Sequence, residues 1–370
     1  MIKISKKRDN SPPYATGLSK NDYLTNYTEE EMDIKNGTAT FVMPHYLTDN
    51  GIQKRYLDET LDTVLKQTDP NWQLVIIDDL SPCKEAVDYL QTVKAKAPDK
   101  IHIIMKKTND GPGFCRNLGI KWAYEHNSPI VLFIDADDLS DHKRLELARK
   151  IMVADPLASV VYSTFKVIDE DSKEVEWDKL SGSIQEIIEG HHGTPPQGFN
   201  AWIDIGTEKG YTNLTSATVV RTEVAYKFPF PPEKVSEDSN AWMRYSAGGG
   251  KFVYCGDIPT LYRIPQHTAG SASRTREGGR DAFYVTKCRV DTDGFVRAVE
   301  IAITNGKIQV EQRDELMVKF HLKLGETMRR EAQMELAYDQ ARLANKVSPE
   351  MTRKWIEKMG FQGWAPKAFA

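Results

Sequence analysis

Cysteine is scarce in this chain of 370 residues, which has only four, at positions 83, 115, 255 and 288. They form no Cys-x-x-Cys pair, and no histidine stands at zinc-finger spacing from them. The spacing therefore argues against a structural zinc module and leaves disulfide pairing as the weaker alternative. We expect reduced thiols, as in a cytosolic protein.

Long apolar runs are also missing. No stretch approaches the ~18 uncharged apolar residues that a membrane-spanning helix needs. The N-terminal residues 1–8 are mostly polar or basic and lack the apolar centre of a secretory signal. We therefore expect a cytoplasmic protein without a transmembrane segment, either free or bound peripherally at the inner membrane face.

Neither sign of charge dominates, since 49 lysines and arginines face 53 aspartates and glutamates, for a formal net charge of -4. A surface that binds polyanions needs a basic excess, so the composition argues against nucleic acid as a partner. Hydrophobic residues make up 40% and charged residues 28%, which is typical of a globular protein. The length suffices for one large domain with an appendage.

Three regions differ in composition. Residues 1–36 are polar, and we expect a loose arm there with one helix near 23–32. Residues 37–280 form the main domain, in two halves that meet near residue 140. Residues 281–370 form a mainly helical C-terminal extension.

Short apolar runs alternate with amphipathic segments in the first half of the main domain. We expect strands at 38–43, 74–77, 101–105 and 130–134, and helices at 53–67, 85–97, 113–126 and 145–153. This alternation predicts an α/β fold with a mostly parallel, Rossmann-like sheet and helices on both faces. In such sheets ligands bind beyond the carboxyl ends of the strands.

The alternation weakens beyond residue 155. We expect one strand at 159–168 with 174–177 as its hairpin partner, a loop at 190–198, strands at 215–221, 252–254 and 260–264, a helix at 237–246, and a mobile loop at 267–280. The longest helical stretch is expected at 311–345. Its dense mixture of both charge signs predicts a solvated or partner-facing helix.

Three carboxylates, Asp135, Asp137 and Asp138, directly follow the apolar strand at 130–134. Such a cluster is costly unless it is neutralised, and Mg²⁺ or Mn²⁺ prefers oxygen ligands. The alternative is that these residues cap the next helix. A second acidic pair elsewhere in the chain shifts the balance toward a metal site.

That second pair, Asp78-Asp79, ends another apolar strand, where a carboxylate suits a nucleobase N–H or a ribose hydroxyl. Its alternative is an ordinary turn. The segment 109–117 contains a Gly-Pro-Gly turn that opens a helix carrying Arg116, an arrangement that suits a diphosphate. There the alternative is a turn in which Arg116 pairs with a carboxylate.

Two further sites depend on context. Glu237-Asp238 begins a predicted helix, where a carboxylate suits a general base for a hydroxyl group. On local sequence alone, a helix capped by Ser236 is the stronger interpretation. A lone histidine such as His267 is usually structural, and becomes of interest only if it closes on a metal.

Together these segments resemble glycosyltransferase family 2, whose members have the GT-A fold. The likeness runs from about residue 38 to 273 and rests on six segments in the family's order, namely 41–46, 61–79, 109–119, 133–138, 237–238 and 262–267. The Gln-x-x-Arg-Trp motif of processive synthases is absent, because Gln266 is followed by His-Thr-Ala-Gly.

The resemblance implies a metal-dependent, inverting transfer of a sugar from a nucleotide-diphosphate donor, a UDP-sugar by family habit, to a hydroxyl of a carbohydrate or other acceptor. Residues 37–140 would then bind the nucleotide and 141–280 the acceptor. The resemblance does not account for the segment 190–213, which we expect to shape the acceptor site. The C-terminal helices would serve acceptor capture, formation of a homo-oligomer, or docking on a membrane surface. A nucleotidyltransferase and a non-catalytic nucleotide-sugar-binding module remain the alternatives.

Residue roles are carried over by position. The resemblance implies Pro44, Tyr46 and Asp79 at the nucleobase, Arg116 at the nucleotide or its phosphates, Asp135 and Ala136 at the ribose or the sugar, Asp137, Asp138 and His267 at Mn²⁺ or Mg²⁺, and Asp238, beside Glu237, as the general base.

Overall fold

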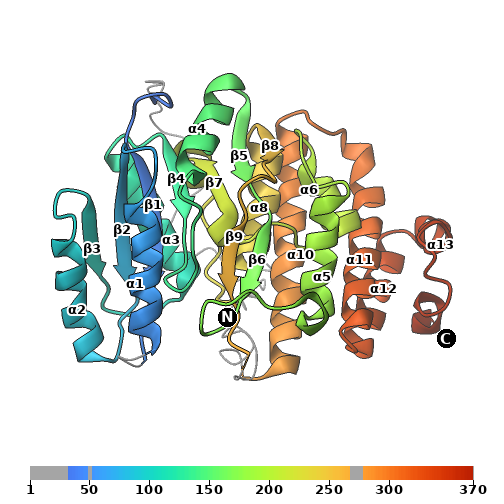
Figure 1. Cartoon of the computed structure of the whole chain (residues 1–370). Coiled ribbons are helices and arrows are strands. Elements are labelled where there is room, and N and C mark those ends of the chain that lie inside the picture. The colour runs from blue at the N-terminus through green and yellow to red at the C-terminus, as the bar shows by residue number, and fades with distance from the viewer. Residues whose placement is uncertain (1–31, 49–51, 267–277, 370) are drawn as a thin grey trace, which may run out of the picture. The chain divides into compact units, whose positions relative to one another are not determined.

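The first four strands and four helices alternate as predicted (Figure 1). The computed structural model describes residues 32–48, 52–266 and 278–369. In chain order the elements are β1 (Ala39–His45), α1 (Ile52–Leu65), β2 (Trp72–Asp78), α2 (Lys84–Ala95), β3 (Ile101–Met105), α3 (Pro112–Glu125), β4 (Ile130–Phe133) and α4 (Arg144–Ala154). Their bounds differ from the prediction by at most two residues. The helix expected at 23–32, most of the loop at 267–280, and His267 lie outside the described residues.

A seven-stranded sheet in the order β3-β2-β1-β4-β7-β5-β8 forms the centre of the fold. Strands β3, β2, β1 and β4 run parallel to one another, and β5 (Ala158–Tyr162) is parallel to β8 (Lys251–Tyr254). Between them β7 (Thr218–Arg221) runs antiparallel to both β4 and β5. The prediction of a mostly parallel sheet is therefore confirmed.

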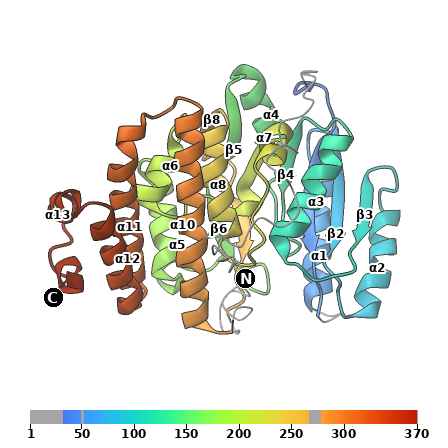
Figure 2. The same ribbon diagram turned by 180° about the vertical axis from the view of Figure 1, so that it is seen from behind.

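Each face of the sheet has its own hydrophobic core, because successive side chains of a strand point to opposite faces. Phe41 and Met43 of β1 pack with the apolar residues of α1, α2 and α4. Val42, between them, packs with α3 and α8 (Glu237–Gly248) on the other face. Helix α3 comes close to the sheet because it carries Gly119, where a Cβ atom would lie 2.3 Å from Val42. Figures 1 and 2 show these two layers of helices from opposite sides.

The single strand expected at 159–168 is wrong. The main sheet keeps only β5, and the chain then leaves it to form β6 (Phe165–Ile168), which pairs with β9 (Thr260–Arg263) in a separate two-stranded sheet. After Ile168 the chain turns back, and Glu174 forms a single antiparallel bridge with Ile168 where a second strand was expected. The chain passes between the two sheets at Ser163 and Thr164: the N–H of Ser163 donates to the carbonyl of Ala217, next to β7, and the carbonyl of Thr164 accepts from the N–H of Thr260 in β9.

Two other predicted boundaries are wrong. The expected loop at 190–198 begins inside α5 (Gly182–His192), whose His191 is buried and held by the carbonyl of Thr212 at 2.6 Å. The strand expected at 215–221 begins only at Thr218, after a 3-10 turn over Thr215–Ala217. The remaining short elements are η1 (Trp177–Lys179), α6 (Ala201–Asp204), the π-helical turn η2 (Ile205–Lys209), α7 (Thr222–Lys227), η4 (Val310–Gln312) and η5 (Ala365–Phe369).

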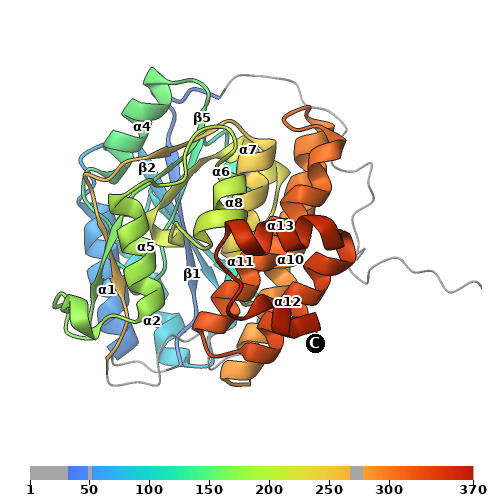
Figure 3. The same cartoon turned by 90° about the vertical axis from the view of Figure 1, so that its right-hand side faces the viewer.

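The C-terminal part is helical, as predicted, and consists of α10 (Arg280–Thr304), α11 (Arg313–Arg330), α12 (Met334–Val347) and α13 (Pro349–Lys358). Figure 3 views the molecule from the side on which these helices gather. The stretch 311–345 is two helices and not one, because the chain turns at Ala332, which has a positive φ of 58°. The longest described helix is α10, with 25 residues.

Helix α11 is mostly buried, so the prediction of a solvated helix is wrong for this part of 311–345, while the partner-facing alternative stays a prediction. Phe320 of α11 stacks on Phe295 of α10 with ring centroids 4.4 Å apart, and Phe295 in turn contacts Trp202 of α6. These residues belong to the same hydrophobic core as Val42 and Phe133 of the sheet. The charged residues that suggested exposure alternate with apolar ones that face this core. In the described part of the chain, no helix has the length and apolar character needed to cross a membrane.

Candidate functional site

A cavity of about 910 Å³ lies where β1, β2 and β4 reach their carboxyl ends. All of the predicted site residues that the structure describes line it, namely Pro44, Tyr46, Asp79, Arg116, Asp135, Ala136, Asp137, Asp138, Glu237 and Asp238. The fold thus brings together carboxylates from three distant segments, and only His267 falls outside the described residues. The parallel topology explains this gathering, since the carboxyl ends of parallel strands share one edge.

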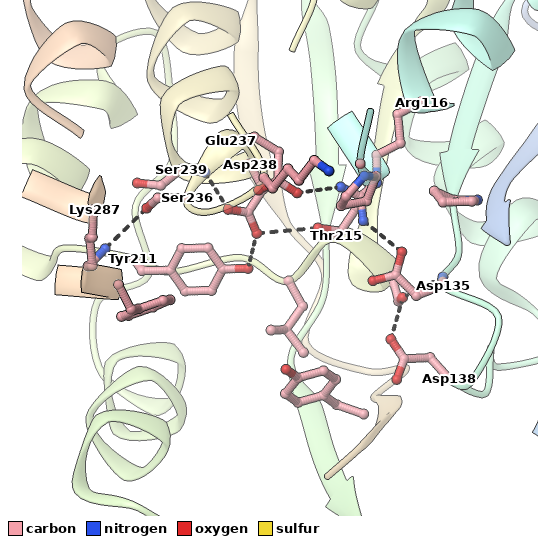
Figure 4. Close-up of a pocket in the computed structure, with 18 of the residues that line it drawn as sticks. Arg116, Asp135, Asp138, Tyr211, Thr215, Ser236, Glu237, Asp238, Ser239 and Lys287 are labelled. Atoms are coloured by element: carbon pink, nitrogen blue, oxygen red, sulfur yellow. Dashed lines mark hydrogen bonds and ion pairs between the residues drawn. The ribbon is translucent and has the colours of Figure 1, made fainter. Parts of the chain in front are cut away.

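Arg116 links two acidic segments at the centre of this cavity (Figure 4). Its Nη2 lies 2.7 Å from Oδ1 of Asp135 and its Nη1 lies 2.8 Å from Oε1 of Glu237. Burial alone would lower the pKa of the guanidinium, but the charges of the two carboxylates outweigh it and raise that pKa. Arg116 is only 2% exposed, so its interactions match the alternative of a carboxylate-paired arginine. Contact with a phosphate stays a prediction.

Asp138 is buried and committed to the protein itself. Its carboxylate accepts hydrogen bonds from the hydroxyl of Ser216 and from the backbone N–H of Arg263, the latter at 2.9 Å. Burial, together with the charges of Asp137 and Asp135, raises the pKa of the Asp138 carboxyl well above its ordinary value. Helix α4 begins at Arg144, after a turn in which Asp141 accepts a bond from Lys143, so the acidic cluster does not cap it.

The acidic cluster at the end of β4 is a candidate cation site. Among the residues that the structure describes, no group of three His, Cys, Asp or Glu side chains is arranged to hold a metal by itself. However, the charges of Asp137 and Asp135 add to the effect of burial in raising the pKa of Asp138, so negative charge is in excess here, and Asp137 is exposed to the cavity. Oxygen donors in such an excess fit Mg²⁺ or Mn²⁺, which commonly takes its remaining ligands from substrate phosphates.

Asp79 holds the turn that opens α3. Its carboxylate accepts from the backbone N–H groups of Asp110 at 3.0 Å and Gly111 at 2.8 Å, and pairs with the ammonium of Lys106. Gly111 has a φ of 91°, which explains the glycine at that turn. Asp79 is 5% exposed yet lines the cavity. Its predicted contact with a nucleobase would therefore be made by a carboxylate that the protein already holds in place.

Asp238 lies at the start of α8 and is held from several directions (Figure 4). Its Oδ2 accepts from the hydroxyl of Tyr211 at 2.7 Å and from that of Thr215 at 3.4 Å, and its Oδ1 accepts from the N–H of Ser239 at 2.8 Å. Burial and the charge of Asp238 raise the pKa of Tyr211 well above its ordinary value, so Tyr211 stays protonated and donates. The carboxylate is thereby fixed in direction.

Glu237 differs from its neighbour. It is buried, and desolvation with the charge of Asp238 raises the pKa of its carboxyl to about 7, although Arg116 opposes the shift. The sequence-based alternative for this segment, a helix capped by Ser236, is wrong. Ser236 occupies the cap position, but its side chain makes no capping bond and its backbone is left-handed, with a φ of 58°.

Sequence reasoning missed the residues that the cavity takes from other segments. Tyr211 and Thr215 contact Asp238, and the cavity continues along α10 and α11 past Lys287, Phe320 and Lys323. No local motif marks these positions. The only signal was the expectation that the segment 190–213, which contains Tyr211, shapes the acceptor site.

Residues 40–212 match the model of the family described as glycosyl transferase family 2. A protein of Rickettsia bellii described as an uncharacterized glycosyltransferase is 32% identical over 118 residues, which are 32% of this chain and 16% of that protein. The uncharacterized glycosyltransferase alr2836 of Nostoc sp. is 29% identical over 236 residues, which are 60% of this chain and 66% of that protein. The chain thus spans less than two thirds of either relative.

Among solved structures, the chain is similar in fold to the mannosyltransferase PcManGT of Pyrobaculum calidifontis, which was solved in complex with GDP-Man and Mn²⁺. The TM-score is 0.51 at 14% identity, over 94% of this chain and 88% of that one. The fold is thus the predicted GT-A fold. The matched segment spans β1 to η2, so this segment, just under half of the chain, belongs to glycosyltransferase family 2.

Proposed function

We propose that the protein transfers a glycosyl group from a nucleotide-diphosphate sugar to an acceptor hydroxyl, with Asp238 as the general base. The observation that carries the proposal is the position of Asp238 midway along one cavity. Toward the sheet lie Asp135, Arg116 and Asp79, which suit a nucleotide. Toward α10 and α11 the same cavity leaves room for an acceptor.

The chain's own residues suggest how the proton is handled. The acceptor oxygen attacks the anomeric carbon as its proton passes to Asp238, and the bond from that carbon to the diphosphate oxygen breaks, which inverts the configuration. The nucleoside diphosphate leaves. Tyr211 and Thr215 hold Asp238 in one direction throughout. A base in such a position contributes about 10²–10⁴-fold to the rate. Glu237 is less suited to this role because it is paired with Arg116.

Asp137, with Asp135, would hold a divalent cation, since Asp138 is engaged by Ser216 and Arg263. When bound, such a cation neutralises charge on the diphosphate. The Mn²⁺ in the structurally similar mannosyltransferase supports this assignment. Arg116, already shared by two carboxylates, would act chiefly by holding Asp135 and Glu237 in place.

The donor is proposed to be a UDP-sugar, because the resemblance to glycosyltransferase family 2 implies that class of donor. The acceptor would enter from the side of α5, α10 and α11, where the cavity is lined by Ile187, Phe283, Phe320, Lys287 and Lys323. Aromatic rings beside ammonium and carboxylate groups suit a carbohydrate, whose faces are apolar and whose hydroxyls are donors and acceptors.

A donor panel tests the proposal. The full chain is incubated with UDP-, GDP- and other nucleotide sugars and Mn²⁺ or Mg²⁺, and release of the nucleoside diphosphate is followed with and without simple glycoside acceptors. We expect release from one donor class, loss of transfer in Asp238→Asn, and unchanged donor binding in that variant. Release of pyrophosphate instead would favour a nucleotidyltransferase. Binding of a donor without turnover under any condition would favour a non-catalytic module.

A further inference from the structure

The residue two positions before the proposed base has an unusual backbone. Ser236 lies in the left-handed region with φ 58° and ψ 16°, directly before Glu237 and Asp238. This conformation is unfavourable for a residue with a side chain, and it persists only where the surroundings hold it. What holds Ser236 therefore also fixes the first turn of α8.

Two residues of α10 hold it. The hydroxyl of Ser236 donates to Oδ1 of Asp291 at 2.6 Å, and Lys287 Nζ lies 2.7 Å from Oδ2 of Asp291 and 3.3 Å from the Ser236 hydroxyl. The three side chains form a closed set of hydrogen bonds, which we call the α10 tether; Figure 4 shows Ser236 and Lys287 beside Asp238. Asp291 is only 6% exposed, so water competes little for these bonds.

Further contacts make the junction of α8 and α10 close and rigid. The side-chain amide of Asn240, one turn into α8, donates to the carbonyl of Val290 at 2.9 Å. Helix α10 carries Gly294 at the crossing, where a Cβ atom would lie 2.7 Å from the Cα of Asn240. Since α10 also packs through Phe295 into the main core, the tether is anchored to the body of the protein.

We propose that the α10 tether positions Asp238 for proton transfer, so that the C-terminal helices are a working part of the site. Resting on the proposed function, the inference adds positioning residues from a segment outside the matched range 40–212. Tyr211 and Thr215 hold the carboxylate of Asp238 on one side. The tether fixes the backbone that carries it on the other.

Two substitutions of Ser236 separate positioning from strain. Both Ser236→Gly and Ser236→Ala remove the hydroxyl, but glycine accepts the left-handed backbone without strain and alanine does not. We expect both variants to lower kcat by about 10–100-fold, the size of effect that small misplacements produce. The donor KM should stay within about 3-fold, because the donor contacts are not altered. The Tm of Ser236→Gly should be at or above that of Ser236→Ala.

If the hydroxyl of Ser236 had only a structural role, kcat of Ser236→Gly would behave differently. The variant Ser236→Gly would then keep the wild-type kcat, since its fold is not strained, and that result would overturn the inference. If the wild type releases no nucleoside diphosphate from any donor, the proposed function fails. If the wild type is active and Ser236→Gly is equally active, the proposed function stands and only the role of the α10 tether fails.

A double-mutant cycle tests the partner. If the hydroxyl acts through Asp291, then Ser236→Gly combined with Asp291→Asn should lower kcat no further than the larger single effect. Multiplied losses would count against a shared tether. Lys287→Met should also lower kcat, while the same change at Lys66, in an exposed pair with Asp62 on α1, serves as the matched control.

Discussion

Arg116 Nη1 lies 2.8 Å from Oε1 of Glu237, and this contact joins the first turn of α3 to the first turn of α8. The same guanidinium also reaches Asp135 at the end of β4. One buried cation therefore connects the half of the sheet that suits the nucleotide with the helix that carries the proposed base. Its removal would leave two carboxylates facing each other without compensation.

Replacement of Arg116 by methionine tests that connection. Breaking a buried ion pair from one side costs about 3–5 kcal/mol, because the remaining charge stays buried and unpaired. We expect a loss of this size in the free energy of unfolding, measured by urea denaturation. The control is Arg55→Met, at a largely exposed pair with Glu59, where about 0–1 kcal/mol is expected. Equal losses in the two variants would argue against a structural role for Arg116.

Glu237 should make stability depend on pH. Its pKa is raised in the folded protein to about 7, from 4.5, so between those values the folded state keeps a proton that the unfolded state has lost. Stability should then fall as the pH rises through this window, by up to ~1.4 kcal/mol per pH unit for one proton, and should level off above it. In Glu237→Gln this slope should be absent. The measurement is the difference between the two unfolding curves from pH 4 to 8; parallel curves would contradict the raised pKa.

Asp137 and Asp138 should respond differently to loss of charge. The carboxyl of Asp138 is buried with a raised pKa and holds Ser216 and Arg263, whereas Asp137 is exposed to the cavity. We expect Asp137→Asn to weaken Mn²⁺ binding in the presence of a nucleoside diphosphate at least ~10-fold, as expected for the loss of a ligand. Asp138→Asn should lower the Tm and leave Mn²⁺ affinity within about 3-fold. Titration followed by the Mn²⁺ electron paramagnetic resonance signal gives both affinities. The reverse order would move the metal assignment to Asp138.

Much of the first half could be predicted because its signals are local. Phe41, Val42 and Met43, which pack into two different cores, stand together in the sequence as an apolar run. The aspartates that follow the strands are recognisable as short acidic motifs. Since parallel strands end at one edge, the sequence also implied that Asp79 and Asp137 line a shared cavity, as they do. Their roles there stay predictions.

The rest depends on contacts between distant segments. Nothing near residue 165 indicates that β6 pairs with β9 almost a hundred residues later. In α11 the many charged residues obscure the pattern of apolar ones such as Phe320. The burial of Phe320 follows from the position of α10, on which it stacks. Tyr211 and Lys287 reach the site by tertiary packing alone, so no spacing rule could have found them.

The packing of the C-terminal helices against the main domain can be tested with two glycines. A Cβ atom at Gly206, in the π-helical turn η2, would lie 2.2 Å from the ring of Phe295 on α10, whereas nothing lies within 4 Å at Gly190 in α5. We expect Gly206→Ala to destabilise the protein by about 1–3 kcal/mol through overpacking. Gly190→Ala, in a helix with open space around it, should stabilise it by about 0.4–1 kcal/mol. Thermal and urea unfolding measure both changes. If Gly206→Ala were as stable as wild type, then η2 and α10 would not be in the close contact that the structure shows.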